Sequence, residues 1–119
     1  ALVALGTLWH DTVVYLLHAK ADQDLAHSAG VHESYPANKS VIGHVLKPGG
    51  PASMYEDRPD LQERAWGARI GNKENMGIAV VLPFGHPLAD PPQQMLRLVE
   101  EAAARIQVNM KHATGIPLR

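Results

Sequence analysis

The sequence has no cysteine, no excess of one charge and no long apolar run. The missing cysteines exclude disulfide frameworks, thiolate metal sites and cysteine nucleophiles together. Lys and Arg number 11 against 12 Asp and Glu, a net charge of -1, so the chain lacks the electrostatic footprint of a nucleic-acid-binding surface. No apolar run approaches the roughly 20 residues that a membrane helix needs. We therefore expect neither membrane association nor direct DNA binding by this chain.

The length and composition indicate one folded domain. The 119 residues can bury a core but cannot hold two domains. Hydrophobic residues make up 45% and charged residues 19%, which is typical of a globular protein. The start, ALVALGTLWHD, has no basic leader, so we do not expect a signal peptide; it begins directly in strand-like sequence, as a fragment of a longer polypeptide would. Nothing suggests secretion, and we expect a cytoplasmic protein.

The first 34 residues predict one β-hairpin and an ambiguous segment. The two arms, Leu2–Leu8 and Thr12–His18, are rich in β-branched and aromatic residues, which favour a half-buried pleated surface. The polar residues that follow have no clear period. They predict either a loop or a short strand around Leu25–Val31.

A second hairpin is predicted in the middle of the chain. Its arms are Trp66–Ile70 and Met76–Phe84, joined by a turn at Gly71–Asn75. The second arm is continuously apolar, as a central strand covered on both faces would be. Pro83 must lie near its end, because proline cannot donate to a ladder.

Two short helices are predicted before this hairpin. YPANKSVIGHVL predicts one over residues 38–46, with Asn38 or Ser40 as its N-terminal cap and Gly43 in its apolar part. We expect Gly43 to let this helix lie close to the sheet, which would offset its cost of about 1 kcal/mol relative to alanine. MYEDRPDLQERAW predicts a second helix of a turn or two, with Asp57 as its cap.

The last segment predicts a long amphipathic helix. Asp90, Pro91 and Gln93 form a capping-box pattern with proline at the first helical position. Apolar residues then recur at three- and four-residue spacing. These are Met95, Leu98, Val99, Ala102, Ala103, Ile106 and Met110. The order of elements predicts an α+β domain whose helices pack on a largely antiparallel sheet.

No group of residues has the pattern of a catalytic or metal site. His27 and His32 with Glu33 lack the spacing of known metal-binding pairs. His10 and Asp11 are adjacent in a turn, where side chains point apart. Ser40 has neither a nucleophile-elbow context nor an evident base. We therefore predict a non-enzyme that needs no cofactor and no metal.

The front of the 38–46 helix leaves two alternatives. Small side chains and open first-turn amides suit a carboxylate, provided that the helix faces a cleft in the sheet. Asn38 or Ser40 could instead cap those amides.

Three segments resemble, in order and spacing, the effector-binding domain of IclR-type transcriptional regulators. YPANKSVIGHVL is similar to the LPxHxTAxGKALLA segment of that domain, and VALGTLWHDTVVYLLHA to its opening hairpin. GIAVVLPFGHPLADPPQQMLRLVEEAAARI is similar to its last strand and terminal helix. The resemblance implies a GAF-like α+β fold that binds a small-molecule effector, homodimers or tetramers, and a DNA-binding helix-turn-helix domain that this chain does not contain.

The resemblance also implies where an effector lies. In the family, the ligand is a small organic or aromatic acid that lies between the sheet and the front of the glycine-bearing helix. By position, the expected ligand-binding residues lie on this helix front, on the last strand and on the strand that precedes it. They are Asn38, Ser40 and Val41, with Lys39 between them; Leu82 and Phe84; and Trp66 and Ala68.

Departures from the family pattern leave two readings of the function. The usual cysteine is missing, and the segment between Leu46 and Trp66 is shorter than usual. Leu82 and Phe84 replace polar positions, so the ligand is bulkier or aromatic, or side chains fill the pocket. The first reading is a sensor of a small organic acid that controls DNA binding. The alternative is a dimerisation module of the same fold with no ligand.

Overall fold

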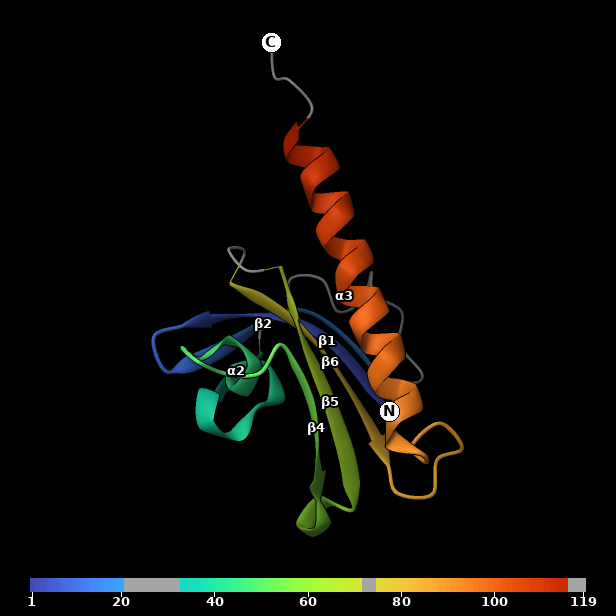
Figure 1. Ribbon diagram of the computed structural model, residues 1–119. Coiled ribbons are helices and arrows are strands. Elements are labelled where there is room, and N and C mark those ends of the chain that lie inside the picture. The colour runs from blue at the N-terminus through green and yellow to red at the C-terminus, as the bar shows by residue number, and fades with distance from the viewer. Residues whose placement is uncertain (21–32, 72–74, 116–119) are drawn as a thin grey trace.

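The computed structural model describes residues 1–20, 33–71 and 75–115, which form one six-stranded antiparallel sheet between two unlike helices (Figure 1). The strands lie in the order β3-β2-β1-β6-β5-β4. Their bounds are β1 Leu2–Trp9, β2 Thr12–Lys20, β3 Glu33–Pro36, β4 Ser53–Arg58, β5 Glu63–Ile70 and β6 Met76–Pro83. The helices are α2, Val41–Leu46, and α3, Pro92–Gly115, with 3-10 turns η1 at Ala37–Lys39 and η2 at Pro59–Leu61. The predicted α+β class and both hairpins are confirmed.

One face of the sheet is covered by α3, which packs on β5, β6 and β4. Its buried residues Met95, Val99 and Ala103 are four residues apart, so they form one stripe toward the sheet. Leu98, expected in this stripe, is 48% exposed. The buried residues of this core are Trp66, Ala68, Ile70, Ile78, Leu82, Ala89, Met95, Val99 and Ala103.

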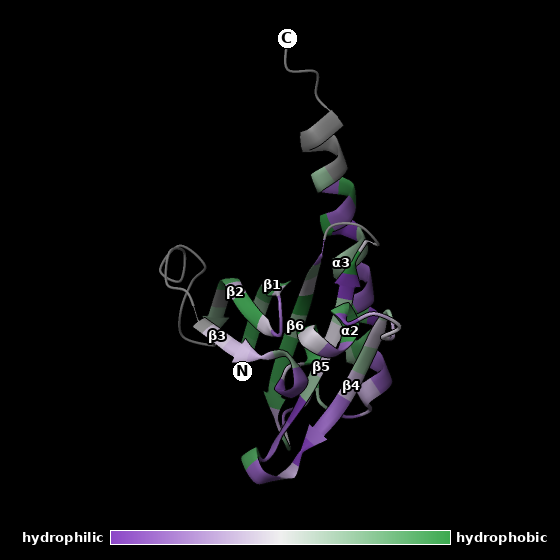
Figure 2. Cartoon of the chain, turned by 90° about the vertical axis from the view of Figure 1, so that its left-hand side faces the viewer, coloured by the Kyte–Doolittle hydropathy of each residue, from purple (hydrophilic) through white to green (hydrophobic). Residues whose placement is uncertain are grey.

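The opposite face of the sheet carries α2. The two helices therefore lie on opposite sides of β5 and β6, as the two views show (Figures 1 and 2). Arg69 of β5 fixes the end of α2, because its guanidinium donates to the carbonyl oxygen of Val45 at 2.6 Å and to that of Gly50 at 3.2 Å. The buried residues of this second core are Ala4, Val13, Tyr15, Val41, Ile42, Ala65, Ala79 and Val81.

Several elements differ in detail from the prediction. The segment around Asp57, predicted as a short helix, forms the edge strand β4 and the 3-10 turn η2, because β4 pairs along its whole length with β5. The short β3 was not predicted at all. The helix α3 begins at Pro92, so the capping-box pattern places its first residue one position too early.

Two further predictions concern the segment that follows the first hairpin and the absence of a membrane-spanning helix. The segment Leu25–Val31 lies outside the described residues. Among the helices that the structure describes, none combines the length and the apolar character needed to cross a membrane. The helix α3 is long but amphipathic, since its buried stripe occupies one side only.

Candidate functional site

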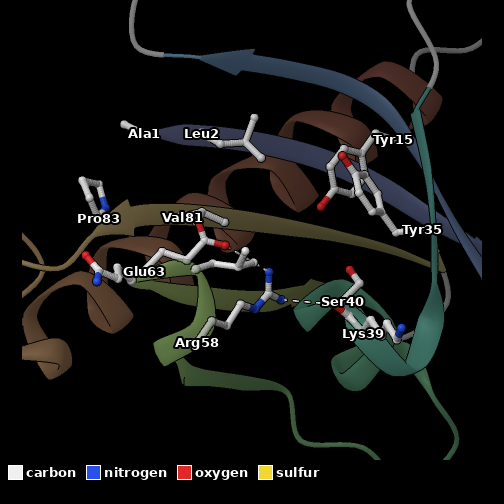
Figure 3. Close-up of a pocket in the computed structure, with 12 residues that line it drawn as sticks. Ala1, Leu2, Tyr15, Tyr35, Lys39, Ser40, Arg58, Glu63, Val81 and Pro83 are labelled. Atoms are coloured by element: carbon white, nitrogen blue, oxygen red, sulfur yellow. Dashed lines mark hydrogen bonds and ion pairs between the residues drawn. The ribbon is translucent and has the colours of Figure 1, made fainter.

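A pocket of about 580 Å³ opens on the α2 side of the sheet (Figure 3). Its size is in the range of small-molecule sites. All six described strands contribute to its wall, together with the turns beside α2 and β4. The lining residues are Ala1, Leu2, Tyr15, Tyr35, Lys39, Ser40, Arg58, Leu61, Gln62, Glu63, Val81 and Pro83.

One part of the pocket is aromatic and apolar. Tyr15 of β2 and Tyr35 of β3 lie with their ring centroids 4.9 Å apart at an angle of 43°. Their strands are paired, so the backbone ladder holds the two rings together. Leu2 and Val81 face the same space from β1 and β6 (Figure 3). This wall suits the apolar body of a ligand, and aromatic faces favour a ring.

The other part of the pocket is built around Arg58, the last residue of β4. Its Nη2 lies 3.2 Å from Oε1 of Glu56 and donates to the carbonyl oxygen of Lys39 at 3.3 Å. Its Nη1 lies 3.7 Å from Oε1 of Glu63. Glu56 also lies 3.8 Å from Nε2 of His44 on α2. A guanidinium held between β4, β5 and η1 is a ready partner for a carboxylate, which it can bind with two parallel hydrogen bonds.

Ser40 is the one buried polar side chain in this pocket whose hydroxyl has no partner among the described residues. The residue is 3% exposed, and its Oγ makes no hydrogen bond there. Ser40 occupies the N-cap position of α2 but does not cap it. A buried hydroxyl left without a partner costs about 1–3 kcal/mol, so a bound polar group would recover that cost.

The expected helix-front residues do not all lie at the pocket. Ser40 lines the pocket. Val41 is buried beneath it, with its side chain close to Gly67 of β5. Asn38 is exposed and is not among the lining residues. Of the two residues considered as caps, Ser40 occupies the N-cap position of α2, but its side chain makes no capping hydrogen bond.

The expected strand residues Trp66, Ala68 and Leu82 lie on the wrong face of the sheet for this pocket. All three belong to the core under α3, and Nε1 of Trp66 donates to the carbonyl oxygen of Pro92 at 2.8 Å. Side chains alternate between faces along a strand, so an error of one residue moves a whole set to the other side. Phe84 follows the end of β6 and is 42% exposed. Neither Leu82 nor Phe84 fills the pocket.

Sequence reasoning missed four of the residues that give the pocket its chemistry: Tyr15, Tyr35, Arg58 and Glu63. Tyr15 could have been found, because the VVY run predicts a strand and strand periodicity gives its face. Arg58 and Glu63 could not, because their segment was assigned to a helix rather than to β4 and β5.

The geometry gives no support to the catalytic and metal-binding patterns. His10 packs against the ring of Trp9 at a centroid distance of 4.3 Å, and both residues are exposed. The residues His27 and His32 lie outside the described residues. Within residues 1–20, 33–71 and 75–115, no three His, Cys, Asp or Glu residues gather as a metal site would require.

The fold is that of the effector-binding domain of IclR-type transcriptional regulators. The chain superposes on an IclR homologue from Microbacterium hydrocarbonoxydans, solved with 4-hydroxybenzoate, with a TM-score of 0.68 and 16% identity over 93% of this chain and 61% of that one. The C-terminal domain of a transcriptional regulator from Vibrio cholerae gives a TM-score of 0.66 and 14% identity over 86% and 83%.

A third similar structure, an IclR transcriptional regulator from Alicyclobacillus acidocaldarius, has a TM-score of 0.62 and 13% identity over 90% of this chain and 60% of that one. The chain thus spans about three fifths of two of these regulators. No family model and no curated protein matches the sequence. The fold implied by the sequence resemblance is therefore confirmed, at low sequence identity.

Proposed function

We propose that this chain is the ligand-sensing domain of an IclR-type transcription regulator, which binds a small organic acid and controls DNA binding by a helix-turn-helix domain outside the chain. The proposal rests mainly on Ser40, whose buried hydroxyl has no partner among the described residues and lies in a pocket that also holds Arg58. The similar structures are regulators, which favours a non-enzymatic, cytoplasmic role.

The pocket supports an acid with an apolar and preferably aromatic body. Arg58 and Ser40 would bind the carboxylate. The Tyr15–Tyr35 pair and Val81 would contact the ring. The complex of a similarly folded regulator with 4-hydroxybenzoate supports this class of ligand.

Regulation requires that the ligand prefer one arrangement of the protein over another. Arg58 supplies a means, because it contacts η1 and lies within ion-pair distance of β5 at the pocket wall. A carboxylate that takes over Arg58 would weaken these contacts and shift the elements around α2. In a dimer or tetramer, such a shift would change the spacing of the DNA-binding domains.

Thermal unfolding with a panel of aromatic and aliphatic carboxylates tests the proposal. A ligand at 100 times its dissociation constant adds about 2.7 kcal/mol to the free energy of unfolding. In Ser40→Ala and Arg58→Gln, we expect affinity to fall about tenfold or more, since hydrogen bonds to charged groups contribute about 1.5–3 kcal/mol. Arg97→Gln, an exposed position on α3, is the matched control and should bind normally. A panel that gives no shift at all would contradict the proposal.

The alternative function is a dimerisation module without a ligand. Its premise that Leu82 and Phe84 close the pocket loses support, because they lie elsewhere. Sedimentation separates the two functions: a module would associate equally well whatever acid is present. A sensor would bind an acid, and Ser40→Ala would weaken that binding.

A further inference from the structure

The charges at the pocket are nearly balanced. Lys39 and Arg58 are the cationic side chains among its lining residues, and Glu63 is the carboxylate. Glu56 adds a second carboxylate, which pairs with Arg58 at 3.2 Å from outside the lining. Arg58 therefore already shares its charge with two carboxylates. The two cationic and two carboxylate side chains are therefore equal in number, so each negative charge that a ligand brings makes the pocket net negative.

The two ion pairs that Arg58 forms, with Glu56 and with Glu63, differ in strength. Its contact with Glu56 is at hydrogen-bond distance, whereas the 3.7 Å contact with Glu63 is an ion pair beyond that distance. One ligand carboxylate can therefore take the Nη1 side of Arg58 by displacing the weaker contact. A second ligand carboxylate would bring a further negative charge into a pocket whose wall still holds Glu63, and Glu63 would repel that charge.

We propose that Glu63 restricts the ligand to compounds with a single negative charge, so that the pocket takes monocarboxylates and rejects dicarboxylates. This inference rests on the proposed function, because it concerns the same pocket. Glu63 acts here as a specificity-determining residue, which repels each negative charge of a ligand and so disfavours a dianion more than a monoanion.

Two probes of nearly the same shape test the inference: 4-carbamoylbenzoate, a monoanion, and terephthalate, a dianion. The 119-residue chain is used with its N-terminus acetylated, because Ala1 lines the pocket and its amine would add a cation. We expect calorimetric titration to give a dissociation constant at least about tenfold lower for the monoanion, equivalent to about 1.4 kcal/mol. This ratio in the unchanged protein is a test that needs no variant.

The variant Glu63→Gln keeps the shape of the side chain and removes its charge. We expect the ratio of the two dissociation constants to fall to within about threefold. Glu101→Gln removes an exposed carboxylate on α3, distant from the lining residues, and should leave the ratio unchanged. Glu56→Gln should lower the ratio less than Glu63→Gln, because Glu56 does not line the pocket.

The outcomes separate the inference from the proposed function. Equal binding of both probes by the unchanged protein, or a ratio that Glu63→Gln does not move, overturns the inference and leaves the acid sensor standing. Failure of both probes, and of every other monocarboxylate tried, overturns the two together.

Discussion

Gly43 is required by the turn that precedes α2 rather than by the sheet. A Cβ atom at this position would lie 2.1 Å from the carbonyl oxygen of Ala37 and 2.7 Å from its Cα. The expectation that Gly43 lets the helix approach the sheet is therefore wrong. That approach depends on glycines of the sheet itself: Gly67 lies under Val41, and Gly77 lies under Ile42.

Gly43→Ala should destabilise the protein by about 1–3 kcal/mol or more, because the new methyl group meets backbone that has no room to rotate away. Alanine is the better helix former, so propensity alone predicts the opposite sign. Urea unfolding measures the change. His44→Ala, the next residue and half-buried, is the control and should change the free energy of unfolding by much less. A more stable Gly43→Ala protein would contradict the close packing of η1 on α2.

At the scale of the elements, apolar periodicity predicts long and central segments well. Both hairpins and α3 follow from it, because their side chains alternate or recur over many residues. The edge strand β4 does not, since its sequence SMYEDR is polar and its strand conformation comes from pairing with β5. Tertiary pairing of this kind leaves no local signal.

Only part of the candidate site could be predicted from the sequence. Ser40 follows from the helix-front pattern, and its position at the pocket agrees with that. The strand residues did not follow, because the resemblance gave their approximate place but not the face. Arg58 and Glu63 depend on β4 and β5 meeting at η2, which only the folded chain brings about.

Neighbouring residues of β6 give a test of the strand faces. Val81 lines the pocket, whereas Leu82 belongs to the core under α3. We expect Val81→Ala to change the affinity for aromatic carboxylates several-fold. Leu82→Val should lower the free energy of unfolding by about 1 kcal/mol and leave affinity unchanged. Titration and urea unfolding of both variants measure these effects. An affinity change confined to Leu82→Val would restore the original assignment of faces.

At the scale of the whole molecule, Arg64 joins parts of the chain that lie far apart in sequence. Its Nε lies 2.5 Å from Oδ1 of Asp57 on β4, and its Nη1 donates to the carbonyl oxygen of Ala89, shortly before α3, at 2.6 Å. The guanidinium carbon lies 5.8 Å from the ring centroid of Tyr55 and 6.0 Å from that of Phe84, within the range of cation–π contacts. This side chain fixes the loop that leads from β6 to α3.

The pair of Asp57 and Arg64 should give the protein part of its sensitivity to acid. The hydrogen bonds from Arg64 hold the pKa of the Asp57 carboxyl below its ordinary value. A carboxyl whose pKa is lower in the folded state stabilises that state above its ordinary pKa, and this stabilisation is lost as pH falls through the lowered value. The effect is modest, because Asp57 is exposed to solvent, which screens the pair.

Urea unfolding of the unchanged protein and of Asp57→Asn between pH 7 and pH 3 measures this contribution. We expect the unchanged protein to be the more stable at pH 7 and the difference to shrink below about pH 4, where an ordinary aspartate becomes protonated. Asp60→Asn removes an exposed carboxylate that makes no ion pair among the described residues, and it should not reproduce this loss. A difference that stays constant down to pH 3 would contradict this contribution, because protonation of Asp57 removes its charge and weakens the hydrogen bonds that it accepts from Arg64.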